Sequence, residues 1–369
     1  MVVAERMRAA QKTGPERARI EWFARPTPGP QDVLVRVRAC AICASDLAGW
    51  READVAPATP GEWNASNPGL TGHEIAGDIV EVGSDVRSSR LGEPVWIDAI
   101  AGCGHCEHCN AGRFTYCSQS QIVSQGFAEY VVAPAGQCLA IPHAIRDYSQ
   151  ASLLFDMVGT PVGAARRARI EAGESVAVWG LGPVGLGLVQ SARIAKAGRV
   201  VGIDPIASRR VLAEQLGATD VLDPSATDAV AAVRELTGGR GADVVLCSVA
   251  SDAGALAAFD SLRLDGRMVT VAGFPPAGGE VPKWVSGNWA CFHGDWPNIL
   301  SLVESGEFEL GRYVTDVFAL DDIEQAFAMR LHAPDRSLKV VVAPGGDAGA
   351  SPGPAETESK RRERTAGSG

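Results

Sequence analysis

A cluster of four cysteines restricts the folding of this chain more than any other feature of its sequence. Two, two and seven residues separate its members, which are Cys103, Cys106, Cys109 and Cys117. Zinc binds four thiolates tetrahedrally, and such short spacings let one compact loop surround the ion. Because four thiolates leave no coordination position open, the spacing predicts a structural zinc that stiffens a lobe. A disulfide framework and four unrelated thiols are the alternatives.

Composition limits the compartment and the partners. The chain has 369 residues, enough for two domains, and its hydrophobic content of 46% is ordinary for a globular protein. Nine cysteines without an apolar signal segment favour a reducing, cytoplasmic setting. The net charge of −10 argues against a nucleic-acid partner. No apolar run approaches the ~20 residues that a membrane helix needs, so we expect a soluble chain.

The pattern of predicted secondary structure changes near residue 145. Before it, short strand patterns such as 33–39 and 75–83 are separated by glycine and proline, which predicts an irregular, mostly β domain. After it, strands and helices alternate at the spacing of βαβ units, which predicts an α/β domain with a doubly wound parallel sheet. The predicted strands of that sheet are 175–179, 199–204, 243–247 and 268–272.

A glycine-rich turn follows the first of these strands and opens a helix. It consists of Gly180, Leu181, Gly182, Pro183, Val184 and Gly185. Such a turn brings backbone amides and a helix N-terminus close to the pyrophosphate of a dinucleotide, and Pro183 suits the first helical turn. Asp204 ends the next strand, where a carboxylate accepts hydrogen bonds from both ribose hydroxyls and repels a 2′-phosphate. The pattern favours NAD over NADP, although Arg209 and Arg210 are close in sequence. A purely structural turn is the alternative.

Two upstream segments carry further metal-ligand types. Cys43-Ala-Ser45-Asp46 precedes Gly72-His73-Glu74. A catalytic zinc takes three protein ligands and keeps one position open, and cysteine and histidine are among its usual ligands. Taken singly, Cys43 is more readily interpreted as a small core residue, and His73 as a hydrogen-bonded turn residue. Their combination with the four-cysteine lobe and the dinucleotide turn favours a metal.

These motifs and their order resemble those of the zinc-dependent medium-chain alcohol dehydrogenases, over nearly the whole chain apart from its tail. The resemblance implies a GroES-like, mostly β catalytic domain over 1–155, which includes the cysteine lobe. It further implies a Rossmann domain inserted over 156–296 and a return to the first domain over 297–343. Residues 344–369 are rich in glycine, proline, serine and charge, and we expect this tail to be disordered.

By position, the resemblance assigns Cys43 and His73 as ligands of a catalytic zinc. Asp156 occupies the place of the third ligand, which is usually Cys or Glu in the family. Glu74 corresponds to an occasional or outer ligand. Asp46 corresponds to the residue that orients the zinc histidine and so sets its tautomer and basicity.

The implied activity is hydride transfer between an alcohol and NAD, with two zinc ions per chain. Zinc would act as a Lewis acid on the substrate oxygen. Ser45 corresponds to the hydroxyl that contacts the substrate and begins the proton relay. A histidine three residues further on often continues that relay, but this chain has Ala48 there. A zinc-independent reductase of activated double bonds or quinones, and a non-catalytic nucleotide-binding protein, are the alternatives.

The expected partners are a small alcohol or carbonyl substrate and further copies of the chain, as a dimer or tetramer. No nucleic-acid or membrane partner is expected. Aromatic side chains suit a pocket for a secondary alcohol or polyol, but they equally suit ordinary packing or a subunit contact. The aromatic residues concerned are Trp50, Trp63, Trp284, Trp289, Phe292 and Trp296.

Overall fold

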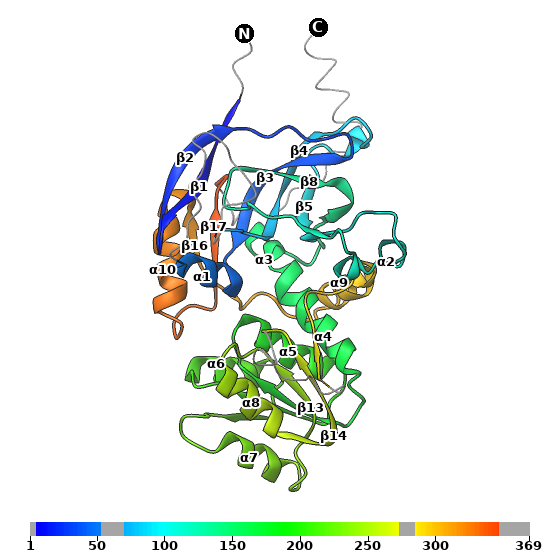
Figure 1. Cartoon of the computed structure of the whole chain (residues 1–369), viewed down its shortest axis with the longest axis vertical. Helices are drawn as coiled ribbons and strands as arrows, with labels where there is room; N and C mark the ends of the chain where they lie inside the picture. Colours follow the sequence, from blue (N-terminus) through cyan, green and yellow to red (C-terminus); the bar gives the residue numbers. More distant parts are fainter. Residues whose placement is uncertain (1–4, 53–69, 273–284, 347–369) are drawn as a thin grey trace. The chain divides into compact units, whose positions relative to one another are not determined.

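The computed structural model describes residues 5–52, 70–272 and 285–346. The chain divides into two compact units (Figure 1). The first unit combines Met1–Cys106, Cys117–Phe155 and Gly311–Gly369, and the second combines Glu107–Tyr116 and Asp156–Leu310. Residues 297–310 were expected in the return to the first domain, but by their contacts they group with the second unit. Trp63, Trp284 and the tail from residue 347 lie outside the described residues.

The first unit is built on a seven-stranded sheet of order β16-β17-β3-β4-β5-β9, with β8 paired to β3. Its neighbours run antiparallel except for the parallel pair β16 and β17. The strands are β3 (Asp32–Ala41), β4 (Glu74–Val82), β5 (Pro94–Ile97), β8 (Tyr130–Pro134), β9 (Cys138–Ala140), β16 (Val314–Ala319) and β17 (Lys339–Ala343). Its α-helices are α1 (Ala44–Arg51), α3 (Tyr148–Ser152) and α10 (Ile323–His332). A short antiparallel pair joins β6 (Ile100–Ala101) to β7 (Gln121–Ile122).

Alternation along β3 explains how this segment lies in the sheet. Val33, Val35 and Val37 are fully buried in the main core of the unit; on the opposite face Leu34 is also buried, while Arg36 and Arg38 are only partly buried. A period of two residues is what a strand requires when one face lies on the core and the other is partly open. The register pairs Ala41 at the end of β3 with Glu74 at the start of β4. This pairing brings the segments that follow Ala41 and precede Glu74 together.

An N-terminal hairpin precedes the sheet. It pairs β1 (Arg6–Gly14) with β2 (Arg17–Ala24). Lys12 on β1 is buried, and its Nζ donates to the backbone oxygens of Gly49 at 2.6 Å and Glu52 at 2.8 Å. A cation at the last carbonyls of a helix satisfies acceptors that have no intrahelical partner. The hairpin therefore holds the C-terminal end of α1.

The second unit contains a six-stranded sheet that is parallel throughout, in the order β12-β11-β10-β13-β14-β15. This is the strand order of a dinucleotide-binding Rossmann fold, as the sequence predicted. Its strands are β10 (Ser175–Trp179), β11 (Arg199–Ile203), β12 (Asp220–Leu222), β13 (Ala242–Cys247), β14 (Leu262–Thr270) and β15 (Val285–Gly287). Strands β12 and β15 were not predicted from the sequence, because three residues are too few to show a period.

Helices cover the parallel sheet of this unit (Figure 1). They are α4 (Thr160–Ala168), α5 (Pro183–Ile194), α6 (Ala207–Gln215), α7 (Ala229–Leu236) and α8 (Asp252–Asp260). The unit also contains α9 (Trp296–Glu304) and, in its other segment, the short α2 (Glu107–Asn110). Trp179 at the end of β10 pairs with Ile203 and with Cys247. The segments after β10, β11 and β13 therefore begin at one edge of the sheet, at its topological switch point. Within the described part of the chain, no helix has the length and apolarity to cross a membrane.

Candidate metal and cofactor sites

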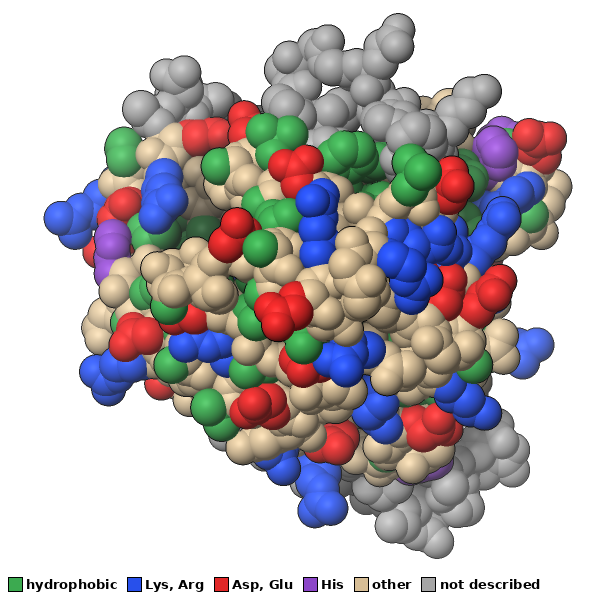
Figure 2. All heavy atoms as spheres, turned by 90° about the horizontal axis from the view of Figure 1, so that it is seen from below, with side chains coloured by type: hydrophobic (Ala, Val, Ile, Leu, Met, Phe, Trp, Pro, Cys, Tyr) green, Lys and Arg blue, Asp and Glu red, His purple; other side chains and the backbone are tan. Residues whose placement is uncertain are grey.

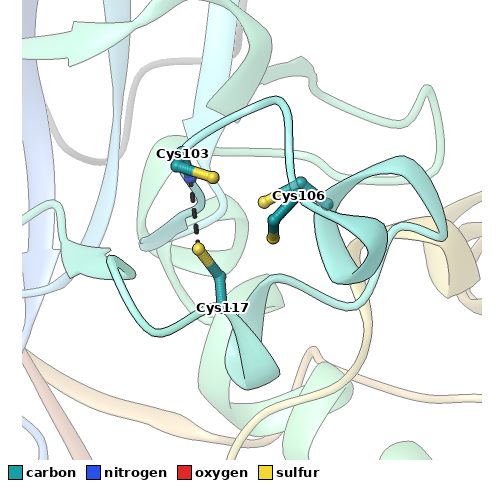
Figure 3. Close-up of side chains that lie close together, drawn as sticks. Cys103, Cys106 and Cys117 are labelled. Carbon is teal, nitrogen blue, oxygen red and sulfur yellow. Dashed lines mark hydrogen bonds between the residues drawn. The ribbon is translucent and has the colours of Figure 1, made fainter.

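Three of the four clustered cysteines lie together in the first unit (Figure 3). The sulfur atoms of Cys103, Cys106 and Cys117 lie within 4.8 Å of one another. The backbone amides of Cys103 and Gln119 each donate to Cys117 Sγ at 3.4 Å. All nine cysteines are free thiols, so the disulfide alternative has no support. Cys109 follows Cys106 by three residues, in α2.

Hydrogen bonds favour the thiolate form of Cys103. The backbone amide of His105 is the main cause, and the amide of Cys106 and the thiols of Cys117 and Cys106 add to it. Together they lower the pKa of Cys103 to about 6. Zinc binds the thiolate and not the thiol, so this group is prepared for a metal at neutral pH. His105 is exposed, as expected of a loop residue.

The middle of the lobe, residues 107–116, groups with the second unit because it packs on the segment after β15. The ring of Phe114 stacks on that of His293, with centroids 4.5 Å apart. Gly294 N donates to Gly112 O at 3.1 Å. A Cβ atom at Gly112 would lie 2.8 Å from Gly294 N, so this close backbone contact requires glycine. His108 also lies here, partly buried, with its ring edge-on to the Tyr116 ring at a centroid distance of 5.8 Å.

A second set of metal-ligand types forms where β3 ends and β4 begins. Ligand atoms of Cys43, His73 and Glu74 lie within 4.8 Å of one another. Cys43 is the N-cap residue of α1, and Glu74 is the first residue of β4. The ring of Phe155 meets the His73 ring edge-on, with centroids 5.9 Å apart. The structure therefore brings together two residues that the resemblance assigned as zinc ligands, with Glu74 beside them.

The carboxylate of Asp46 accepts hydrogen bonds from the segments that carry these residues. Its Oδ2 accepts from Cys43 N at 2.9 Å, and its Oδ1 accepts from Gly72 N at 3.2 Å and from the Thr71 hydroxyl. The side chain is 1% exposed, so these hydrogen bonds compensate for its desolvation. We expected Asp46 to orient the histidine, and these hydrogen bonds run to the turn that leads into His73.

Glu74 forms an ion pair with Lys339 on β17, inside the first unit. The two side chains are 0% and 2% exposed. A buried carboxylate needs a compensating charge, and removal of one partner of such a pair is usually strongly destabilising. Lys339 was not identified from the sequence. A lysine within the apolar run Leu338-Lys-Val-Val-Val is the one signal that could have drawn attention to it.

Asp156 directly follows Phe155, whose ring contacts His73. It lies in a π-helix, Leu154–Gly159, which continues into α4. Single π-helical turns inside α-helices often occur at functional sites. Within the second unit, Asp156 Oδ1 accepts from the Thr160 hydroxyl at 2.9 Å. Thr160 is a second residue that the sequence analysis missed, since no spacing rule predicts a π-helical turn.

Ser45 lies in the first turn of α1, two residues after Cys43, and is exposed. Its hydroxyl is therefore open to solvent or to a substrate. Ala48, also exposed, occupies the position of the absent relay histidine.

The glycine-rich turn has the geometry that the sequence predicted. Gly180 has a φ of +83°, which favours glycine. A Cβ atom at Gly185 would lie 1.8 Å from Gly180 O, whereas one at Gly182 would meet no atom within 4 Å. Gly182 is the N-cap of α5, with Pro183 and Val184 opening the helix. Space at Gly182 beside unpaired helical amides fits the approach of a phosphate.

Asp204 is 4% exposed and already accepts backbone hydrogen bonds. Its Oδ2 accepts from Leu181 N at 2.8 Å, and its Oδ1 accepts from Ile206 N at 2.8 Å. Arg209 Nη1 lies 3.7 Å from Oδ2. Arg210 donates to the backbone oxygen of Asp204 and pairs with Asp223. The carboxylate thus ties the end of β11 to the glycine-rich turn, and Arg209 partly offsets its charge.

The aromatic residues divide into core and surface. Trp50 and Trp296 are 1% and 2% exposed, and Trp50 packs on Phe327 with ring centroids 4.5 Å apart. Phe292 packs edge-on to Tyr116 at 5.2 Å. Trp289 is 54% exposed. On the face seen in Figure 2, acidic and basic side chains lie beside one another.

Comparison with known proteins identifies the family. The family model described as "Alcohol dehydrogenase GroES-like domain" matches residues 29–143, and the one described as "Zinc-binding dehydrogenase" matches residues 183–295. A "probable zinc-binding alcohol dehydrogenase" of Mycobacterium tuberculosis is 34% identical over 340 residues, which cover 87% of this chain and 85% of that relative. The chain belongs to the zinc-type medium-chain dehydrogenase/reductase family.

Other members of this medium-chain family are similar over nearly their full lengths. The sorbitol dehydrogenase of Bacillus subtilis (strain 168) is 28% identical over 356 residues, which cover 93% of this chain and 98% of that relative. A solved structure described as a zinc-binding dehydrogenase of Sinorhizobium meliloti 1021 bound to NADP has a TM-score of 0.78 at 29% identity, and the match covers 92% of this chain and 100% of that chain. These findings confirm the predicted family and the mixed α/β fold. They support an oxidoreductase of the alcohol and polyol dehydrogenase type.

Proposed function

We propose that this medium-chain dehydrogenase oxidises a secondary alcohol or polyol, or reduces the corresponding carbonyl, with two zinc ions per chain and NAD as its cofactor. The observation that carries the proposal is the group formed by Cys43, His73 and Glu74 in the first unit. A thiolate and an imidazole are usual ligands of catalytic zinc. A second metal-binding group in the same chain, the cysteine lobe, supports a separate structural ion.

The residues fit a catalytic zinc by their chemistry. Cys43 supplies a thiolate, His73 an imidazole, and Asp156 an anionic oxygen, which makes three protein ligands. Asp156 is proposed as the third ligand because it adjoins Phe155, which touches His73. Bound zinc and NAD supply a Lewis acid for the substrate oxygen and an acceptor for the hydride. The positive charge of Lys339 neutralises the negative charge of the Glu74 carboxylate next to these ligands.

The remaining groups around Cys43 bind and move protons. Ser45, exposed in the first turn of α1, accepts the proton of the substrate hydroxyl through a hydrogen bond and passes it to solvent. With Ala48 in place of a histidine, this exit is through water. Asp46 keeps Cys43 and the turn before His73 in place through its three backbone and side-chain acceptor contacts.

The second unit supplies the dinucleotide site. Gly182 and the N-terminus of α5 receive the pyrophosphate. Asp204 accepts the ribose hydroxyls, and its charge opposes a 2′-phosphate. Because Arg209 lies 3.7 Å from that carboxylate, we expect a moderate preference for NAD rather than exclusion of NADP.

A screen of alcohols tests the function. The protein with its metals is assayed with ethanol, secondary alcohols and sugar alcohols, with NAD or NADP, while the absorbance of the reduced cofactor is followed. The proposal expects higher kcat/KM for a secondary alcohol or polyol than for ethanol. If none of the alcohols reduces the cofactor, and the protein instead reduces a quinone or an activated double bond, the result would favour the alternative zinc-independent reductase.

The state of assembly is a separate proposal. We propose that the chain forms a homo-oligomer, as a dimer or tetramer. Light scattering of the purified protein measures its mass in solution, and a monomer at micromolar concentration would contradict this proposal.

A further inference from the structure

One hydroxyl is bound to the carboxylate that we propose as the third metal ligand. Thr160 Oγ1 donates to Asp156 Oδ1 at 2.9 Å, one turn further along the same helix. Thr160 is 5% exposed. The contact lies wholly within the second unit, at the point where the π-helix passes into α4. Because both residues lie in one continuous helical segment, the contact depends on a single helical turn.

The backbone of Thr160 is itself held from a distant segment. Asn288, which follows β15, donates from Nδ2 to Thr160 O at 3.2 Å and to Ala290 O at 3.0 Å. On the other side, a Cβ atom at Gly187 of α5 would lie 2.5 Å from Pro161 Cγ and 2.9 Å from Met157 O. The segment that carries Met157 and Pro161 thus packs so closely on α5 that position 187 requires glycine. The Thr160 hydroxyl therefore has a defined position.

We propose that Thr160 is a positioning residue that orients the Asp156 carboxylate toward the catalytic metal. A carboxylate can bind a metal through one or both of its oxygens, whereas a thiolate at this place has a single ligand atom. By holding Oδ1, the Thr160 hydroxyl restricts rotation of the carboxylate and favours binding through one oxygen. Hydrogen bonds to ligating carboxylates serve this purpose in metal sites generally. This inference rests on the proposed role of Asp156.

The test compares Thr160→Val, which removes the hydroxyl at nearly constant volume, with Thr160→Ser, which keeps it. Metal affinity is measured by competition with a chelator, and the cobalt-substituted protein gives the absorption spectrum of the site. The Val variant should bind the catalytic metal roughly 10- to 100-fold more weakly and show an altered cobalt spectrum, because hydrogen-bond partners of ligands typically contribute that much. The Ser variant should restore both. The metal of the cysteine lobe should be unchanged and serves as the internal control.

A second background separates this inference from the proposed function. In Asp156→Cys the ligand is a thiolate, so the change Thr160→Val should no longer alter metal affinity. An equal loss in both backgrounds would mean that Thr160 acts only on folding and would overturn the inference, as would unchanged affinity and spectrum in Thr160→Val alone. If the Val variant does not fold, Thr160→Ala is measured in the same two backgrounds. Full metal content in Asp156→Ala would instead overturn the ligand assignment in the proposed function.

Discussion

The pKa of the Cys103 thiol lies well below that of an ordinary cysteine. Hydrogen bonds, chiefly from the His105 amide, lower its pKa from 9.0 to about 6. After removal of the metal, we therefore expect iodoacetamide to modify Cys103 with a midpoint near pH 6, as followed by mass spectrometry of the peptide. A depressed pKa adds stability that is complete above pH 9.0 and lost as the pH falls through about 6.

Cys138 provides the control for this measurement. Burial raises the pKa of its thiol to about 12, so it should stay unmodified in the folded protein over the same range. A midpoint for Cys103 near 9.0 would mean that the metal-free lobe has lost the backbone arrangement described above.

Asp204 gives a second prediction at the residue scale. Asp204→Ser removes a ribose acceptor and a negative charge, so the ratio of kcat/KM for NAD over NADP should fall by about tenfold, since hydrogen bonds to charged groups are worth roughly 1.5–3 kcal/mol. Asp204→Asn keeps an acceptor oxygen for Leu181 N or Ile206 N and separates the effect of charge from loss of the turn. Arg209→Gln should move the ratio the opposite way. A wild type that prefers NADP would contradict the assignment.

Helix α5 illustrates how one element serves two functions through different glycines. Gly182→Ala adds a methyl group to open space, so stability should not change, but the methyl group occupies the place of the pyrophosphate. The Kd for NAD should rise about tenfold, which is a loss of about 1.4 kcal/mol of binding. Titration calorimetry and thermal unfolding measure the two quantities.

Gly187→Ala is the matched variant on the same helix. Its methyl group would lie 2.5 Å from Pro161 Cγ and 2.9 Å from Met157 O. Overpacking of this kind costs about 1–3 kcal/mol of unfolding free energy. It should also displace the π-helix that carries Asp156 and lower the metal content. A Gly187→Ala protein as stable as the wild type would mean that the helices separate easily.

The whole molecule should contain two metals with different effects on its stability. Between residues 103 and 117 the lobe has only one short α-helix and one 3₁₀ turn, so its folding depends on the metal. Cys106→Ser should release one zinc and reduce the unfolding free energy by on the order of a few kcal/mol. Cys43→Ser should release the other zinc and abolish turnover with a smaller change in stability.

Metal analysis and thermal unfolding of the two variants measure these effects. Activity remaining in Cys43→Ser at more than about one hundredth of the wild-type kcat would contradict the role of the metal, because Lewis-acid stabilisation acts mainly in the transition state. Fewer than two metals in undamaged wild-type protein would contradict the count.

The sequence alone determined the features that arise from local spacing. The cysteine spacings, the glycine-rich turn and the βαβ alternation each lie within a short segment, and their geometry follows from neighbouring residues. The sequence did not reveal β12 and β15, which are too short to show a period, or the π-helical turn at Asp156, for which no spacing signal exists.

The tertiary structure decided which distant residues meet. Cys43 and His73 approach because the register of β3 and β4 pairs Ala41 with Glu74. Lys339, 265 positions after Glu74, joins them because β17 pairs with the same end of β3. Such contacts depend on the pairing of whole strands, whose register is set by burial of one face of each. No local pattern contains that information, so the ion pair of Glu74 with Lys339 and the anchoring of Thr160 by Asn288 could be seen only in the folded chain.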